Sequence, residues 1–133
     1  MTLQPGHEEA LRRAGVVWVG LEDRPPKAVW HVWHDHAVLV VVGGSEQDLP
    51  GASTAVRGVV VVRPRGALSG RLADLPAAVS RLVPGSAAWE TAVPVLAAAR
   101  LNATGTDGLA ERWASESLVL RLDLPGAGGR TDG

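Results

Sequence analysis

The chain has 133 residues, 46% of them hydrophobic, and 13 basic against 14 acidic side chains give a formal net charge of −1. This length suits one domain with its own core, and the balanced charge argues against nucleic-acid binding, which needs a concentrated basic face. The absence of cysteine excludes disulfides, thiolate metal sites and a cysteine nucleophile. No apolar run is long enough to cross a membrane and the N-terminus lacks a signal peptide's apolar core, so we expect a cytoplasmic protein.

Hydrophobic periodicity predicts mostly strands, with short connections and few helices. Successive strands joined by short connections favour an antiparallel sheet that closes into a small barrel. We therefore expect one mainly β domain at residues 1–124, with six strands and a helix before the last strand, followed by a disordered tail at 125–133. In chain order, the pattern predicts a helix at 7–14, strands at 16–22, 28–34, 37–42 and 57–63, a long strand within 68–83, a helix at 87–101 bent at Pro94, a helix at 106–115 and a strand at 117–124.

Aromatic and imidazole rings gather in residues 27–42, which hold two of the five tryptophans and three of the four histidines of a chain without phenylalanine or tyrosine. The strands 28–34 and 37–42 predict a hairpin, and Trp30 and Trp33 are expected on opposite faces of the first strand. This hairpin is either the wall of a ligand site or part of a β-sheet core with a polar tip.

The three histidines of the hairpin could bind zinc or copper only if the turn folds one of them back. In an extended strand, His34 and His36 lie on one side and His31 on the other. We interpret His34 and His36 as a polar hairpin tip and predict no metal site. The role of His31 stays open.

Several features of the chain resemble a known family. They are the order of these strands, the hairpin, the long strand around residues 71–83, the helix that begins with the segment from Pro84 to Glu90, and the closing strand. The phrases Val-Trp-His-Val-Trp and Arg-Leu-Asn-Ala add to the likeness. The chain resembles the FMN-binding split β-barrel superfamily of pyridoxamine 5′-phosphate oxidase, flavin reductases and deazaflavin-dependent reductases. It is most similar to the short members common in actinobacteria, over residues 8–124.

The resemblance implies a homodimer that binds FMN or a deazaflavin in a groove between subunits, and a small oxidoreductase in which the cofactor supplies the redox chemistry. It names no defined catalytic residue. Trp30, His31 and Trp33 would shape the ring pocket. The candidates to meet the phosphate are Lys27, Arg57, Arg63 and Arg65.

Two alternatives remain beside the flavoprotein. The loop Glu46 to Asp48 is acidic where the family usually has a basic residue, which favours a split barrel that has lost its cofactor and serves as a binding or scaffolding protein. The third possibility is a relative that binds haem or another flat ligand, with a histidine such as His31 as the iron ligand. No Gly-x-Ser-x-Gly frame supports a hydrolase.

Overall fold

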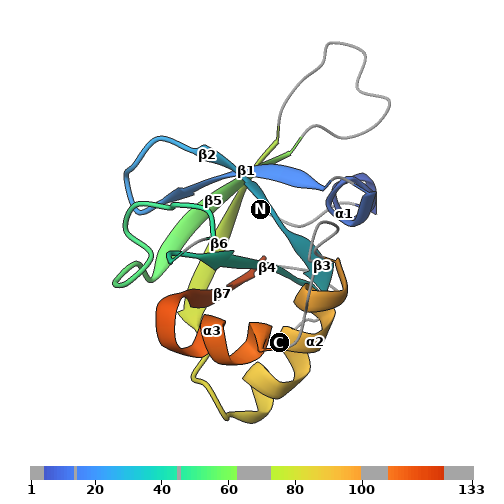
Figure 1. The fold of residues 1–133 in the computed structure, drawn as a ribbon. Coiled ribbons are helices and arrows are strands. Elements are labelled where there is room, and N and C mark those ends of the chain that lie inside the picture. The colour runs from blue at the N-terminus through green and yellow to red at the C-terminus, as the bar shows by residue number, and fades with distance from the viewer. Residues whose placement is uncertain (1–4, 14, 45, 63–72, 100–107, 125–133) are drawn as a thin grey trace, which may run out of the picture.

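The computed structural model describes residues 5–13, 15–44, 46–62, 73–99 and 108–124. Within these ranges the chain forms an antiparallel sheet flanked by short helices (Figure 1). The strands are β1 (Val16–Leu21), β2 (Lys27–Trp30), β3 (Val32–His34), β4 (Ala37–Val42), β5 (Arg57–Val62), β6 (Ala73–Arg81) and β7 (Leu118–Asp123). The helices are α1 (Pro5–Arg13), α2 (Ala87–Ala99) and α3 (Leu109–Glu116).

The sheet curls until its two edges meet. Its strand order is β2-β1-β5-β6-β7-β4-β3, and every neighbouring pair is antiparallel. The edge strands β2 and β3 are consecutive pieces of one segment, with only His31 between them. Both edges therefore lie at the same place, and the strands enclose a nearly closed barrel. The predicted split barrel with a helix before the last strand is confirmed, with seven strands in the described residues instead of six.

The prediction of one strand at 28–34 is wrong, because this segment is two strands. Trp30 pairs with Val16 on β1, whereas Val32 pairs with Leu39 on β4. The chain thus changes its hydrogen-bonding partner at His31. Alternating side chains indicate extended backbone but do not identify the neighbouring strand. The alternation continues through His31, so the sequence predicted one strand where the structure has two.

One apolar cluster fills the barrel. Val17, Val19 and Leu21 of β1 are buried there and Trp18 points outward, as the alternation predicted. Leu11 of α1 joins the same cluster near the start of β1. The loop before β5 adds Leu49, Ala52 and Ala55 to this cluster. It runs to the start of β5, which is paired with the end of β1.

A second apolar cluster lies outside the barrel, under α2 and α3 (Figure 1). It explains why all six residues of β4 are buried: Leu39 and Val41 face the helices, while Val38 and Val40 face the barrel interior. The periodicity of the helix predicted at 87–101 places Trp89, Val93 and Leu96 on its buried face, and all three are buried in this cluster, together with Leu109 and Trp113 of α3. The helix α2 continues through Pro94 as one element.

Several predicted boundaries extend beyond what the structure describes. The strand expected at 57–63 is observed to Val62, and the long strand expected within 68–83 is observed from Ala73 to Arg81. The remaining residues of those segments, the end of the helix 87–101 and the start of the helix 106–115 lie outside the described residues, as does the tail at 125–133. The domain boundary at residue 124 stays a prediction.

Candidate ligand pocket

The turn of the β3–β4 hairpin holds His36 in a backbone conformation that is unfavourable for histidine. His34 pairs with Ala37, so Asp35 and His36 form a two-residue loop, and their φ angles are 52° and 63°. Positive φ at both positions matches the twist of a hairpin and is adopted most readily by asparagine and glycine. A histidine there carries backbone strain, of the kind that persists where surrounding contacts hold it in place.

Replacing His36 by glycine is expected to raise the free energy of unfolding by about 1 kcal/mol, because glycine adopts positive φ without steric cost. Urea unfolding followed by circular dichroism measures the change. The matched control is His34→Gly in the adjacent strand, which is expected to destabilise the protein. A loss of stability in His36→Gly would show that the edge-on contact of His36 with Trp33, at 6.5 Å between ring centroids, outweighs the strain.

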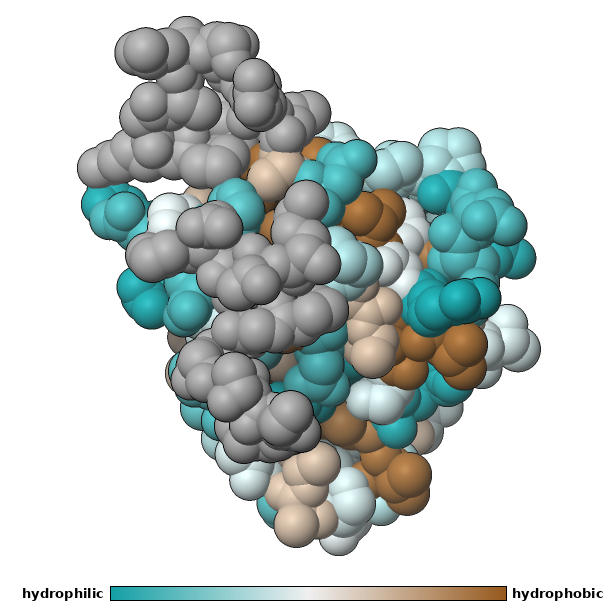
Figure 2. Space-filling model, turned by 180° about the vertical axis from the view of Figure 1, so that it is seen from behind, coloured by the Kyte–Doolittle hydropathy of each residue, from teal (hydrophilic) through white to brown (hydrophobic). Residues whose placement is uncertain are grey.

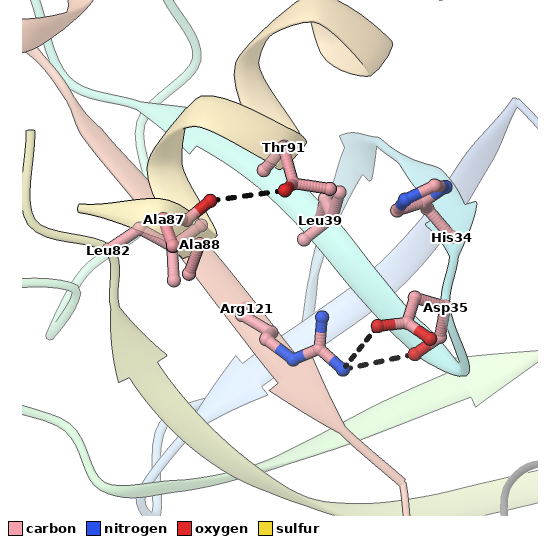
Figure 3. Close-up of a pocket in the computed structure, with 9 residues that line it drawn as sticks. His34, Asp35, Leu39, Leu82, Ala87, Ala88, Thr91 and Arg121 are labelled. Atoms are coloured by element: carbon pink, nitrogen blue, oxygen red, sulfur yellow. Dashed lines mark hydrogen bonds and ion pairs between the residues drawn. The ribbon is translucent and has the colours of Figure 1, made fainter. Parts of the chain in front are cut away.

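A pocket of about 350 Å³ lies between this hairpin tip and the start of α2 (Figure 3). Leu39 of β4 lies at its centre, and the helix contributes small side chains that leave room for a ligand. Its volume falls within the range of small-molecule sites, and such sites are mostly apolar with a few polar groups. The lining residues are His34, Asp35, Leu39, Leu82, Ala87, Ala88, Thr91, Ala92 and Arg121.

Arg121 is fully engaged at the edge of this pocket. Its Nη2 donates to the backbone oxygen of Asp35 at 3.0 Å and lies 3.8 Å from the Asp35 carboxylate, as Figure 3 shows. Its Nε donates to Asp123 Oδ1 at 2.9 Å. Two carboxylates thus neutralise one guanidinium, and the contact with the Asp35 carbonyl fixes the hairpin tip. Arg121 holds the pocket in shape more than it offers a free positive charge.

His34 is the pocket's available donor group. Its imidazole is half-buried, and within the described part of the chain it makes no hydrogen bond or ion pair. Thr91, in contrast, donates its hydroxyl to the carbonyl of Ala87 in its own helix at 3.1 Å. The pocket therefore combines apolar walls with one imidazole that is free to ligate or to hydrogen-bond.

The two tryptophans of the hairpin segment do not share a site. Trp30 packs against the cluster under the helices, and Trp33 packs against the barrel core. They lie on opposite faces as expected, but on different strands. Neither lines the pocket beside His34.

The loop that follows β4 serves the fold. The Gln47 side chain accepts from the Trp30 amide and donates to the Trp30 carbonyl, both at 2.9 Å, and so completes the edge of β2. Glu46 accepts from the indole nitrogen of Trp113 at 2.9 Å. These contacts give a structural reason for an acidic and amide-bearing loop, independent of any phosphate.

The basic residues named from the sequence lie apart from one another. Lys27, at the start of β2, forms an ion pair with Asp48 at 3.6 Å. Arg57, at the start of β5, lies near Glu22. The pKa of the Glu22 carboxyl is lowered mainly by the backbone amides of Val56 and Arg57, with a further contribution from the Arg57 charge. Arg63 and Arg65 lie outside the described residues.

His31 is buried at the junction of the barrel's edges, with 5% of its surface exposed. Its Nε2 lies 2.8 Å from the carbonyl oxygen of Leu11, and its backbone amide donates to the carbonyl of Gly15 at 3.2 Å. Its Nδ1 is buried without a hydrogen-bond partner. Desolvation lowers the pKa of this imidazole, so His31 is a neutral group that joins α1 to the barrel.

The pocket's helical wall and Arg121 were not named as site residues from the sequence. Ala87, Ala88 and Thr91 carry no chemical signature of their own, and only the fold brings them opposite β4. Arg121 offered a weak signal, as a charged residue flanked on both sides by apolar residues of its strand. Its neighbours in space, Asp35 and Asp123, could not be identified before the register of β4 and β7 was known.

No described helix is long and apolar enough to span a membrane. The described residues also contain no group of three or more histidine, cysteine, aspartate or glutamate side chains placed to hold a metal ion.

No protein-family model matches the chain, and no curated protein matches its sequence. Among solved structures it is similar to HutZ, the haem storage protein of Vibrio cholerae, with a TM-score of 0.61. The two are 10% identical, and the match covers 93% of this chain and 91% of that one. At this identity the likeness shows a shared fold.

Proposed function

We propose that the protein is a small split-barrel binding protein for a planar apolar cofactor, with haem as the leading candidate, and that it acts as a cytoplasmic homodimer. The observation that carries the proposal is the pocket of about 350 Å³ in which one unengaged imidazole, His34, stands among small apolar side chains. The fold shared with a haem storage protein supports testing haem first.

The residues that line the pocket fit haem in two respects. The faces of a porphyrin are apolar and suit Leu39 and the alanines of α2. A neutral imidazole is a common ligand of haem iron, and His34 is the histidine with a free side chain at the pocket. His31 is a weaker candidate for the same role, because its Nε2 already contacts the Leu11 carbonyl within the barrel wall. Bound haem would supply iron-centred ligand or redox chemistry; the chain's own part is to hold it.

A flavin or deazaflavin is the second candidate. Its ring would need Trp30, His31 and Trp33, and its phosphate would need free cations from Lys27, Arg57, Arg63 and Arg65. Of these four, Lys27 already pairs with Asp48. Arg121, which lines the pocket but was not among the four, is paired with two carboxylates. The flavin phosphate and the two haem propionates alike find no unpaired cation among the described residues that line the pocket, so the preference for haem rests on the apolar walls and the imidazole of His34.

The experiment is a titration of the purified protein with haem, followed by the Soret absorbance, beside a parallel titration with FMN. We expect saturable haem binding, and at least about tenfold weaker binding in His34→Ala, because loss of an iron ligand would remove more than about 1.4 kcal/mol. The matched control is His36→Gly, which removes an imidazole from the same hairpin tip without touching the pocket and should bind as the wild type does.

The outcomes separate the candidates. Haem binding that is unchanged in His34→Ala would reject His34 as the ligand. Binding of FMN without haem would favour the flavin reading and its phosphate residues. Binding of neither would favour the cofactor-less scaffold that the acidic loop first suggested.

A further inference from the structure

The hydrophobic side chains at the surface are scattered. Figure 2 shows the molecule from behind, where brown groups of the described residues are set between teal ones. The two most exposed large ones are Val83, 65% exposed between β6 and α2, and Val56, 58% exposed before β5. Single exposed residues of this kind are normal and mark no partner. The pocket beside His34 differs, because Leu39, Leu82 and three alanines of α2 gather in one recess.

This pocket is narrow for the ligand proposed above. Its volume of about 350 Å³ lies near the lower limit of small-molecule sites, which enclose about 300–1,000 Å³. A porphyrin with its side chains is larger than the drug-sized ligands that fill such sites. Haem therefore needs one wall of the pocket to move outward before it can reach His34.

The walls of the pocket differ in how firmly they are held. The α2 wall is fixed by Trp89, Val93 and Leu96 in the cluster under the helices. Arg121 lies on β7, which has a strand on each side, and its Nε is held by Asp123. The hairpin tip is held least, because β3 is three residues long, stands last in the strand order of the sheet and has no fully buried residue. The tip is therefore the wall that can move.

A contact between Arg121 and Asp35 ties this tip to the rest of the barrel. Nη2 of Arg121 donates to the carbonyl of Asp35 at 3.0 Å and lies 3.8 Å from its carboxylate, and Figure 3 shows this contact joining the tip to β7. The Asp35 side chain is 67% exposed and that of Arg121 is 26% exposed. Water and salt therefore reach the contact and weaken it, so the contact can open without unfolding of the barrel.

We propose that the contact between Arg121 and Asp35 is an autoinhibitory latch on the pocket. When the latch is closed, the hairpin tip lies against β7 and the pocket is too small for its ligand. When the latch opens, the tip moves away from β7 together with His34, and the ligand enters between the tip and α2. This inference rests on the proposed function, because it concerns the same ligand, and it adds how access to the site is controlled.

The latch makes a prediction opposite to that for a residue that contacts the ligand. A ligand that binds only the open state has an apparent dissociation constant equal to the intrinsic one divided by the open fraction. Arg121→Met loses both contacts with Asp35. It should therefore bind haem at least about threefold more tightly than the wild type, through faster association in stopped-flow Soret measurements. Loss of a residue that contacts haem would weaken binding instead.

The reactivity of His34 tests the latch in the protein without ligand. Carbethoxylation by diethyl pyrocarbonate, located by mass spectrometry, should modify the half-buried His34 at least about threefold faster in Arg121→Met than in the wild type. His36 is exposed in the same turn and should keep its rate. The matched control is Arg112→Met, because Arg112 is exposed on α3 and does not line the pocket; it should change neither rate. Circular dichroism confirms that each variant is folded.

A second variant isolates the charge of the latch. Asp35→Asn keeps the carbonyl that accepts from Arg121 and suits the positive φ of the turn, so it removes only the carboxylate. Its His34 should react at a rate between those of the wild type and Arg121→Met. Raising sodium chloride from about 50 mM to about 500 mM should speed the reaction in the wild type and leave Arg121→Met unchanged. If Arg121→Met does not fold, Asp35→Asn and the salt series decide alone.

These measurements separate the latch from the ligand. Unchanged reactivity of His34 in the folded variants would overturn the latch, and so would haem binding that is equal or weaker in Arg121→Met. Haem binding by the wild type would in both cases keep the proposed function. Faster modification of His34 with no haem binding by any of the proteins would reject haem and keep the latch as a gate on the pocket.

Discussion

Replacing Trp113 by alanine is expected to lower the free energy of unfolding by about 3–5 kcal/mol, the range measured when a large aromatic ring is removed from a protein core. Trp113 is 1% exposed and is the largest of the fully buried side chains in the described residues. It joins α3 to the cluster formed by Leu39, Val119 and the buried face of α2. Its loss opens a cavity between helices and sheet that short helices cannot close without moving.

The indole of Trp113 has a second role, which a conservative variant isolates. Its Nε1 donates to Glu46 at 2.9 Å and so ties the loop after β4 to α3. Trp113→Phe keeps most of the ring and loses this hydrogen bond, so it should cost about 1–3 kcal/mol. Urea unfolding followed by circular dichroism suits both variants, since the fluorescence of the native state changes with the mutation. If Trp113→Ala cost no more than Trp113→Phe, the packing argument would be wrong.

This region also reaches the proposed ligand pocket. Leu39 and Ala92 belong to the cluster around Trp113 and line the pocket beside His34. In variants that remain folded, a disturbed cluster should weaken haem binding even though Trp113 itself does not line the pocket.

Local periodicity was sufficient to predict most of the barrel. The alternation placed Val17, Val19 and Leu21 on one face of the first strand, because side chains on a strand point to opposite faces in turn, and this face is the buried one in β1. The spacing of Leu109 and Trp113, four residues apart, likewise fits one face of a helix, and both are buried in α3. These features depend only on residues close in sequence.

Features that depend on distant partners were not predicted. Residues 28–34 read as one strand, although the chain changes its partner from β1 to β4 at His31. The apolar runs of β4 and β5 look alike in sequence, but helices cover only β4, so Val59 remains half-buried on the outer face while every β4 residue is buried. The pocket likewise depends on the approach of α2 to the hairpin tip, and no local pattern encodes that approach.

A fall in pH from 7.5 to 5.5 is expected to destabilise the protein through His31. Burial lowers the pKa of this imidazole below its usual value of 6.5, because the hydration that a charged ring would lose outweighs its contacts with the backbone of Leu11 and Gly15. Between the folded-state pKa and 6.5 the unfolded chain binds more protons than the folded one, so stability rises with pH in that window. The full contribution is present above pH 6.5 and is lost as the pH falls, with a slope of at most about 1.4 kcal/mol per pH unit.

His31→Gln identifies the source of this pH dependence. Its side-chain amide can still donate to the Leu11 carbonyl that contacts His31 Nε2, but it does not titrate, so the variant should lose less stability than the wild type between pH 7.5 and 5.5. The comparison uses urea unfolding at both pH values, above the range in which the Glu22 carboxyl, whose pKa is lowered, changes its charge. Equal slopes for the two proteins would assign the acid sensitivity to other groups. A smaller slope in the variant would locate it where the two edges of the barrel meet, since His31 is the single residue between β2 and β3.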